Sequence, residues 1–234
     1  MQVPEARLEP GVWWITPTLP VHVMDASTPG PTLIVQAGIH GDEVAGVHAV
    51  EELLESGLRP KKGRLILIPR MNPAACRART RTAAGGKDLN RCFPGHRESS
   101  AVEDRLAYAL FQLVLHEKPA LVATLHESHK RYDPAVTPSF GQTLVYGVRP
   151  CPTVIEHTVD RLNEHSSSPE ERWCTLYFPV ATSSTEQIVE ATGCVGTCVE
   201  TWMGFEESRR VAMHKQVVRL LLDAYEVFPW TETL

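Results

Sequence analysis

The sequence predicts an α/β fold, in which a mostly parallel or mixed, twisted sheet carries helices on both faces. Two observations lead to this prediction. Apolar runs of strand length, such as residues 32–38 and 120–128, alternate with segments of helical periodicity. Polar turns that contain histidine follow these runs. Strands that alternate with helices build a largely parallel sheet covered on both sides, and its ligand sites lie at the carboxyl ends of the strands.

The first part of the chain has four segments with the pattern of regular structure. The expected elements are irregular edge strands at 12–26, a buried strand at 32–38, an amphipathic helix at 43–56 and a second buried strand at 64–69. Pro17 and Pro20 interrupt the first segment, as is tolerated only at a sheet edge or a strand end. The unbroken apolar character of 32–38 is typical of a strand covered on both faces.

A long polar stretch at 70–99 follows, rich in arginine, glycine and asparagine. Loops of this length inside a compact domain are uncommon and usually functional. The remaining expected elements are a helix at 100–117, strands at 120–128 and 142–147, a helix at 152–165, strands at 173–180 and 194–201 with a short helix between them, and a last helix at 207–227. We find no repeat and no linker, so 234 residues are expected to form one domain, 1–234.

Composition narrows the classes of partner and the expected location. The chain has 23 basic and 28 acidic residues, so its formal net charge is 23 − 28 = −5. A mildly acidic chain without a basic block is a poor candidate for binding nucleic acid or an anionic membrane. The first residues lack a signal-peptide pattern, and no apolar run is long enough to span a bilayer, so we expect a cytoplasmic protein. The six cysteines lack paired zinc-ribbon spacing. The oligomeric state stays open.

Histidines and carboxylates stand where three predicted strands end. His40 and Glu43 follow the first buried strand, His126 ends another, and Glu200 lies at the end of the strand at 194–201. Two imidazoles and a carboxylate form a three-ligand zinc site that leaves one position for water. For either histidine alone, a residue that caps a loop is the better interpretation, but their shared position at strand ends beside a polar loop favours a metal site.

The segment GGKDLNRCFPG at 85–95 is a second candidate for binding. It is not a phosphate loop, because Arg81 stands where that motif needs glycine and Asp88 where it needs serine or threonine. Asn90 and Arg91 suit recognition of a carboxylate, for which arginine provides two parallel donors. A salt bridge on the surface of a loop is the alternative interpretation.

Taken together, these motifs resemble a known family. GIHGDE, NPAACRARTR, DLNRCFPG, LHES and CVET occur in the order found in the succinylglutamate desuccinylase and aspartoacylase family, within the carboxypeptidase A-like zinc hydrolases. The resemblance covers roughly residues 30–204. The spacing between Glu43 and His126, 126 − 43 = 83 residues, is nearer to that of the deacylases than to that of the carboxypeptidases.

The resemblance implies a role for each matching residue. His40, Glu43 and His126 match the ligands of one zinc ion per chain, and Glu200 matches the catalytic glutamate. Arg81 matches the arginine that polarises the scissile carbonyl. Asn90 and Arg91 match the pair that binds the substrate carboxylate. The implied activity is hydrolysis of an amide bond in a small molecule or short peptide that bears a free carboxylate.

Several alternatives remain beside this interpretation. We expect the C-terminal β-rich segment that is typical of aspartoacylases to be absent, because few residues follow the predicted helix at 207–227. This expectation leaves an N-acyl-amino-acid deacylase and a small zinc carboxypeptidase or peptide amidase both open. A module that binds a metal or a carboxylate without catalysis is less favoured, because it would not need Glu200. Asp42 could serve to orient a metal ligand, or it could be a residue at the start of the helix. Glu127 and His129 suit support or surface positions better than contact with substrate.

Overall fold

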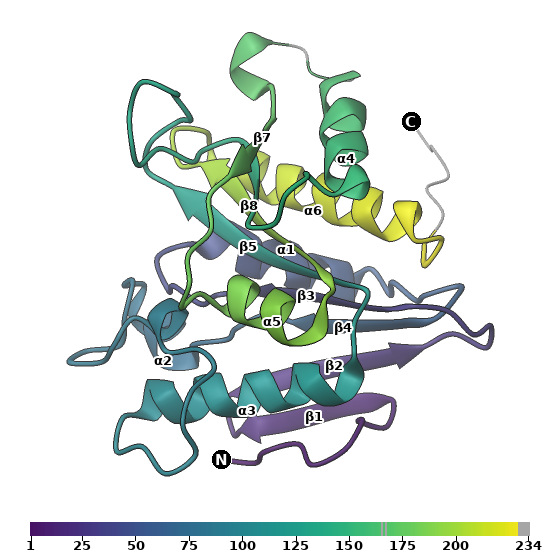
Figure 1. Cartoon of the computed structure of the whole chain (residues 1–234), viewed down its shortest axis with the longest axis vertical. Coiled ribbons are helices and arrows are strands. Elements are labelled where there is room, and N and C mark those ends of the chain that lie inside the picture. The colour runs from purple at the N-terminus through teal and green to yellow at the C-terminus, as the bar shows by residue number, and fades with distance from the viewer. Residues whose placement is uncertain (165, 167, 229–234) are drawn as a thin grey trace.

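The computed structural model describes residues 1–164, 166 and 168–228 of the chain. These residues form one mixed sheet of eight strands in the order β1-β2-β4-β3-β5-β8-β6-β7 (Figure 1). The strands are β1 (Gly11–Thr16), β2 (Leu19–Asp25), β3 (Thr32–Ala37), β4 (Arg64–Ile68), β5 (Leu121–Ser128), β6 (Thr143–Tyr146), β7 (Cys174–Tyr177) and β8 (Val195–Trp202). β4, β3, β5 and β8 run parallel at the centre, whereas β2 and β6 join them antiparallel on either side.

Helices cover both faces of this sheet. The α-helices are α1 (Val44–Glu55), α2 (Pro73–Ala78), α3 (Val102–Glu117), α4 (Thr153–Glu164), α5 (Ser184–Thr192) and α6 (Glu207–Ala224). α1, α4 and α6 lie on one face, and α3 and α5 lie on the other (Figure 1). The predicted α/β class, with a mixed sheet and helices on both sides, is confirmed.

The central strands are apolar throughout because each supplies side chains to two cores. All six residues of β3 are buried. Leu33 and Val35 point into the core beneath α1 and α6, whereas Ile34 points into the core beneath α3. Successive side chains of a strand face opposite sides of the sheet, so a strand between two helical layers has no polar face.

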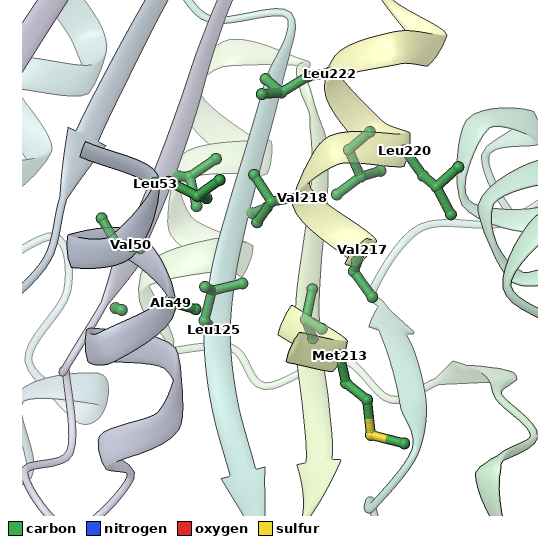
Figure 2. Packing of buried hydrophobic residues seen from close by; sticks show 14 of the residues in the cluster. Ala49, Val50, Leu53, Leu125, Met213, Val217, Val218, Leu220 and Leu222 are labelled. Atoms are coloured by element: carbon green, nitrogen blue, oxygen red, sulfur yellow. The ribbon is translucent and has the colours of Figure 1, made fainter. Parts of the chain in front are cut away.

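The larger core lies where α1 and α6 meet over β5. Figure 2 shows Val50 and Leu53 of α1 on one side of Leu125, and Val218 of α6 on the other. Leu53 is 1% exposed, and Leu125 and Val218 are fully buried. Truncating one buried leucine to alanine typically costs about 2–5 kcal/mol, so this packing holds α1 firmly against the sheet.

The polar stretch at 70–99 differs from the predicted loop, because it contains α2 and a short 3-10 helix, η1 (Leu89–Arg91). Asn72 caps α2 by accepting a hydrogen bond from Ala75 N at 3.2 Å, and Pro73 occupies its first turn. Six residues are too few to show an apolar stripe, so periodicity could not reveal this helix. A second 3-10 turn, η2, spans Pro169–Glu171.

Other boundaries agree closely with the predicted ranges. The edge segment forms the hairpin of β1 and β2, in which Pro20 lies near the start of β2 opposite Trp14. The predicted helix at 152–165 corresponds to α4, and its expected last residue, 165, lies outside the described residues, as do 229–234 of the expected domain. Within the described part of the chain, no helix is both long enough and apolar enough to cross a bilayer.

Candidate active site

Three predicted metal ligands meet at the carboxyl edge of the sheet. His40 lies in the turn after β3, Glu43 directly precedes α1, and His126 lies in β5; all three are buried. Their donor atoms lie within 4.8 Å of one another. The Glu43 carboxylate lies between the two rings, with Oε1 2.6 Å from His40 Nδ1 and Oε2 2.7 Å from His126 Nδ1. Residues of these types, with their donor atoms this close together, could hold a divalent cation.

The turn between β3 and α1 is shaped by its neighbours. Gly38 has φ +67°, a left-handed conformation that glycine adopts without strain. Gly41 has no room for a side chain, because a β-carbon there would overlap the backbone of Ala75 in α2. Gly41 N also donates to Thr80 O at 3.0 Å. The close contact and this hydrogen bond with the segment after β4 therefore fix the turn in the position that places His40 in the cluster.

Charges within the cluster oppose the effect of burial. Burial alone would raise the pKa of Glu43, but the charge of His126 and hydrogen bonds from both imidazoles hold it well below its usual range. Burial likewise tends to lower the pKa of His40, yet hydrogen bonds to Asp88 and Glu43 outweigh it and raise that pKa. The site thus keeps an ionised carboxylate in the interior.

Glu200 stands next to this cluster because of strand register. β5 and β8 are parallel neighbours, and their pairing sets His126 opposite Glu200. Burial is the main cause that raises the pKa of the Glu200 carboxyl, while the nearby histidines oppose it. A carboxyl group whose pKa is shifted towards neutrality can both accept and return a proton near neutral pH.

Asp88 is a site residue that the sequence analysis did not identify. Its Oδ1 accepts from His40 Nε2 at 3.1 Å and from Asn90 N at 2.9 Å, and its Oδ2 accepts from Arg81 Nη2 at 2.9 Å. A carboxylate on the outer nitrogen of a ligating histidine fixes the ring and its tautomer. The sequence does contain a feature that could have identified Asp88: an aspartate side chain can accept a hydrogen bond from the backbone N–H two residues later, here that of Asn90.

Arg81 reaches the same cluster from the loop after α2. Its guanidinium Nη1 lies 3.7 Å from Glu43 Oε1, and Asp88 holds its Nη2. The side chain remains 49% exposed, whereas that of Glu43 is 7% exposed. Arg81 therefore has donors at the boundary between the buried donors and the open cavity.

Asn90 and Arg91 lie side by side in η1 but in different environments. Asn90 is buried, and its Oδ1 accepts from Ser184 N at 3.0 Å at the start of α5. Arg91 is exposed and donates from Nη1 to Asn90 O at 2.9 Å. Asn90 thus ties the loop to α5. Among the described residues, the remaining donors of Arg91 have no partner and can bind a ligand.

These side chains line one cavity of about 360 Å³. Its walls include all seven of the predicted site residues, namely His40, Glu43, Arg81, Asn90, Arg91, His126 and Glu200. The loop between β5 and β6 adds Lys130 and Phe140, and the segment between β7 and α5 adds Phe178. In Figure 1 the loops that follow α2 and β5 extend from the same edge of the sheet.

Glu127, Asp42 and His129 each had two possible roles from the sequence, and their neighbours in the structure bear on them. Glu127 Oε2 accepts from Ala45 N at 2.8 Å, and Oε1 forms an ion pair with Arg210 of α6. Glu127 therefore supports the start of α1, as expected of a supporting residue. Asp42 Oδ1 is buried and has no hydrogen-bond partner among the described residues, so neither of its expected roles gains a contact. His129 lines the cavity from the loop after β5.

Part of the chain is similar in sequence to one known family of enzymes. A family model described as the Succinylglutamate desuccinylase/Aspartoacylase catalytic domain matches residues 29–133. The resemblance to this family is confirmed. N-alpha-acetyl-L-2,4-diaminobutyric acid deacetylase of Halomonas elongata is 37% identical over 123 residues, 51% of this chain and 35% of that protein. Succinylglutamate desuccinylase of Pseudomonas syringae is 34% identical over 113 residues, 43% of this chain and 32% of that protein. The match thus spans about a third of each curated relative.

Solved structures share the fold over a larger part of the chain. Cell shape determinant Csd4 of Helicobacter pylori has a TM-score of 0.80 at 18% identity, over 89% of this chain and 55% of that chain. An aspartoacylase family protein of Mesorhizobium loti has a TM-score of 0.72 at 23% identity, over 99% of this chain and 73% of that chain. These similarities extend the shared architecture beyond residue 133, through β8 and Glu200.

Proposed function

We propose that this chain is a zinc-dependent hydrolase that cleaves an amide bond in a small substrate with a free carboxylate. The observation that carries the proposal is the convergence of His40, Glu43 and His126 beside Glu200 at the floor of one cavity. The names of the two curated relatives, a deacetylase of an N-acetylated amino acid and a desuccinylase, support the same reaction class.

The donor set fits a zinc ion. His40, Glu43 and His126 are buried, and their donor atoms already converge. Two imidazoles and one carboxylate leave a fourth position open, which is the composition of catalytic zinc sites. When bound, zinc supplies Lewis acidity, which makes water a stronger acid and draws electron density from a carbonyl group.

The protein's own groups carry out the remaining chemistry. Glu200 takes a proton from the attacking water and delivers it to the leaving nitrogen as the amide bond breaks. Arg81 donates to the carbonyl oxygen as negative charge develops there, while Asp88 orients its guanidinium. Asn90 and Arg91 bind the substrate carboxylate and set the position of the scissile bond.

A small carboxypeptidase or peptide amidase is the second candidate. The free donors of Arg91 would serve a peptide's terminal carboxylate as well as that of an acylated amino acid. Among the solved structures of the same fold, Csd4 of Helicobacter pylori is described as a D,L-carboxypeptidase, at 19% identity. The two candidates differ in the group on the carbonyl side of the cleaved bond, so a mixed panel of substrates separates them.

The deciding experiment follows amine release from N-acetyl and N-succinyl amino acids and short peptides by mass spectrometry. Zinc-loaded protein is compared with Glu200→Gln, which keeps the shape of the side chain but cannot accept the proton. We expect the variant to retain one zinc per chain and to lose about 10²- to 10⁴-fold in kcat.

Cleavage of an N-acyl amino acid would identify a deacylase, whereas cleavage of a short peptide would identify a peptidase. Normal turnover by Glu200→Gln would remove the proposed role of Glu200. Zinc binding at one equivalent without release from any compound would instead favour the module that binds a metal or a carboxylate without catalysis. Cytoplasmic location stays a prediction.

A further inference from the structure

Glu186 is a charged residue of the cavity wall that the proposed reaction does not use. It lies in the first turn of α5, two residues after Ser184, whose N–H is held by Asn90. Its neighbour Thr185 contacts Cys198 in β8, with Oγ1 3.2 Å from Sγ. Glu186 is half-buried and lines the same cavity as the predicted metal ligands.

Helix capping does not account for this carboxylate. The sequence from Ser183 to Glu186 matches a capping box, in which the glutamate bonds back to the N–H of the serine. Half of that motif forms, because Ser183 Oγ accepts from Glu186 N at 3.2 Å. The other half does not, because Ser183 N donates to Val180 O at 2.8 Å. The carboxylate is therefore available for another partner.

Space for the carboxylate is provided by Gly147, just after β6. A β-carbon at Gly147 would overlap both carboxylate oxygens of Glu186. The carboxylate thus lies directly over bare backbone, which limits its access to water. Within the described residues, no arginine, lysine or histidine forms an ion pair with it, and no hydrogen bond to it is formed. Burial, followed by the charge of Glu190, raises the pKa of Glu186, as expected for a carboxylate without a cation.

Strand register gives the distance of Glu186 from the reacting groups. Thr143 of β6 pairs with Glu200, and Val145 pairs with Cys198. Gly147, which the carboxylate of Glu186 covers, lies four residues beyond Thr143, a separation of roughly 13 Å in extended chain from the level of Glu200. It therefore faces a part of the substrate that is distant from the scissile bond.

Apolar side chains line the space between these two ends. Phe140 and Phe178 pack edge to face, with ring centroids 5.0 Å apart, and both are half-buried in the cavity wall. Val145 and Val180 are also part of the wall. Such a surface suits methylene groups, which gain about 0.8 kcal/mol for each CH₂ that leaves water.

We propose that Glu186 binds an ammonium group at the end of an aliphatic chain, so that the substrate class is an N-acylated diamino acid or a peptide that carries such a side chain. This inference rests on the proposed hydrolase function. In such a substrate Arg91 binds the carboxylate, the phenylalanines and valines cover the methylene groups, and Glu186 forms a charge-assisted hydrogen bond with the amine.

The test compares pairs of Nα-acetyl amino acids that differ only in replacing a terminal ammonium by a methyl group. The pairs are 2,4-diaminobutyrate with norvaline, ornithine with norleucine, and lysine with 2-aminoheptanoate. For at least one chain length we expect kcat/KM of the zinc-loaded wild type to favour the ammonium compound by about 10- to 100-fold, mainly through KM.

Glu186→Gln is the informative variant, and Glu190→Gln is its control. Glu190 lies one turn later in α5, is exposed and is not part of the cavity wall, so its variant makes the same change of charge outside the cavity. We expect the preference for ammonium to fall to near one in Glu186→Gln and to persist in Glu190→Gln. Circular dichroism melting of each variant verifies that α5 remains folded.

The outcomes separate the two proposals. Hydrolysis of the methyl compounds as fast as the ammonium compounds, or a preference that survives in Glu186→Gln, overturns the role of Glu186 and leaves the hydrolase proposal intact. A wild type that holds zinc but neither cleaves any compound nor binds ornithine or norleucine derivatives by calorimetry overturns both.

Discussion

The cavity has a buried side and an open side, and the two are built differently. His40, Glu43 and His126 are buried and lie near the ends of strands or directly before a helix, whereas Arg81 and Arg91 extend from the segment between α2 and α3 and are far more exposed. A metal site requires ligand positions within a few tenths of an ångström. Binding of a substrate carboxylate by a long side chain tolerates more freedom. The sheet therefore supplies the rigid half and the loop supplies the adaptable half.

Asp88 connects the two sides. One of its oxygens accepts from His40, and the other accepts from Arg81. Burial tends to raise the pKa of Asp88, but hydrogen bonds and charges from His40 and Arg81 hold it well below its usual range. Changes on the buried side are thus expected to act on metal binding, changes on the open side on substrate binding, and a change at Asp88 on both.

The largest effect is expected on the buried side. His126→Ala removes one of the three proposed donors to the metal, so we expect zinc affinity to fall by more than about 100-fold and activity to reach background, because even supporting residues of such sites contribute 10- to 100-fold. Zinc content after dialysis against a chelator of known affinity measures this loss.

His157→Ala, which removes an exposed imidazole from α4, serves as the control and should retain zinc. Stoichiometric zinc in dialysed His126→Ala would show that the cluster is not the metal site.

A smaller effect is expected at the link between the two sides. Asp88→Asn keeps the size of the side chain but removes the charge that orients His40 and Arg81. We expect zinc affinity to fall about 10- to 100-fold, and kcat at saturating zinc to fall as well. Competition with a fluorescent chelator gives the affinity, and Asp160→Asn on the exposed side of α4 is the matched control. Unchanged zinc affinity together with reduced kcat would assign Asp88 to the open side alone.

On the open side, the effect should be confined to substrates with a carboxylate. Arg91→Ala is expected to raise KM about 10-fold or more for a free acid, because a hydrogen bond to a charged group is worth about 1.5–3 kcal/mol. Amidated versions of the same compounds should be affected much less, and Arg91→Lys should restore part of the affinity. Initial rates on the two series measure this difference. An equal increase in KM for acids and amides would contradict the proposed contact.

The smallest effect concerns the scaffold behind the buried side. His214 of α6 is fully buried, with Nε2 3.1 Å from Thr201 Oγ1, and burial lowers its pKa to about 3. The unfolded chain takes up this proton near pH 6.5, so the stability that neutral His214 provides is lost as pH falls below that value.

Relative to His214→Asn, the wild type should therefore lose about 2 kcal/mol in free energy of unfolding between pH 6.5 and 5. Urea denaturation of both proteins at matched zinc content measures the difference. Parallel pH profiles for the two proteins would mean that His214 does not titrate on unfolding.

The pattern of apolar runs was sufficient to predict the eight strands, the longer helices and their arrangement in layers. It also located His40, Glu43, His126 and Glu200 at strand ends, because the carboxyl ends of parallel strands must share one edge. Apolar character did not fix the exposure of every residue, because Val102, the first residue of α3, is 49% exposed. Short elements without an apolar stripe, such as α2, carried no periodic signal.

Only the tertiary structure decided which loop residues meet the strand ends. The contacts of Asp88 with His40 and of Asn90 with Ser184 join residues 48 and 94 positions apart. They depend on the path of the chain after α2 and on how α5 approaches β8. The orientation of Glu186 similarly depends on Ser183 using its N–H elsewhere and on Gly147 leaving space. The burial of a strand can be predicted from the residues of that strand alone. These contacts depend on packing between segments that are distant in the sequence, so no local pattern predicts them.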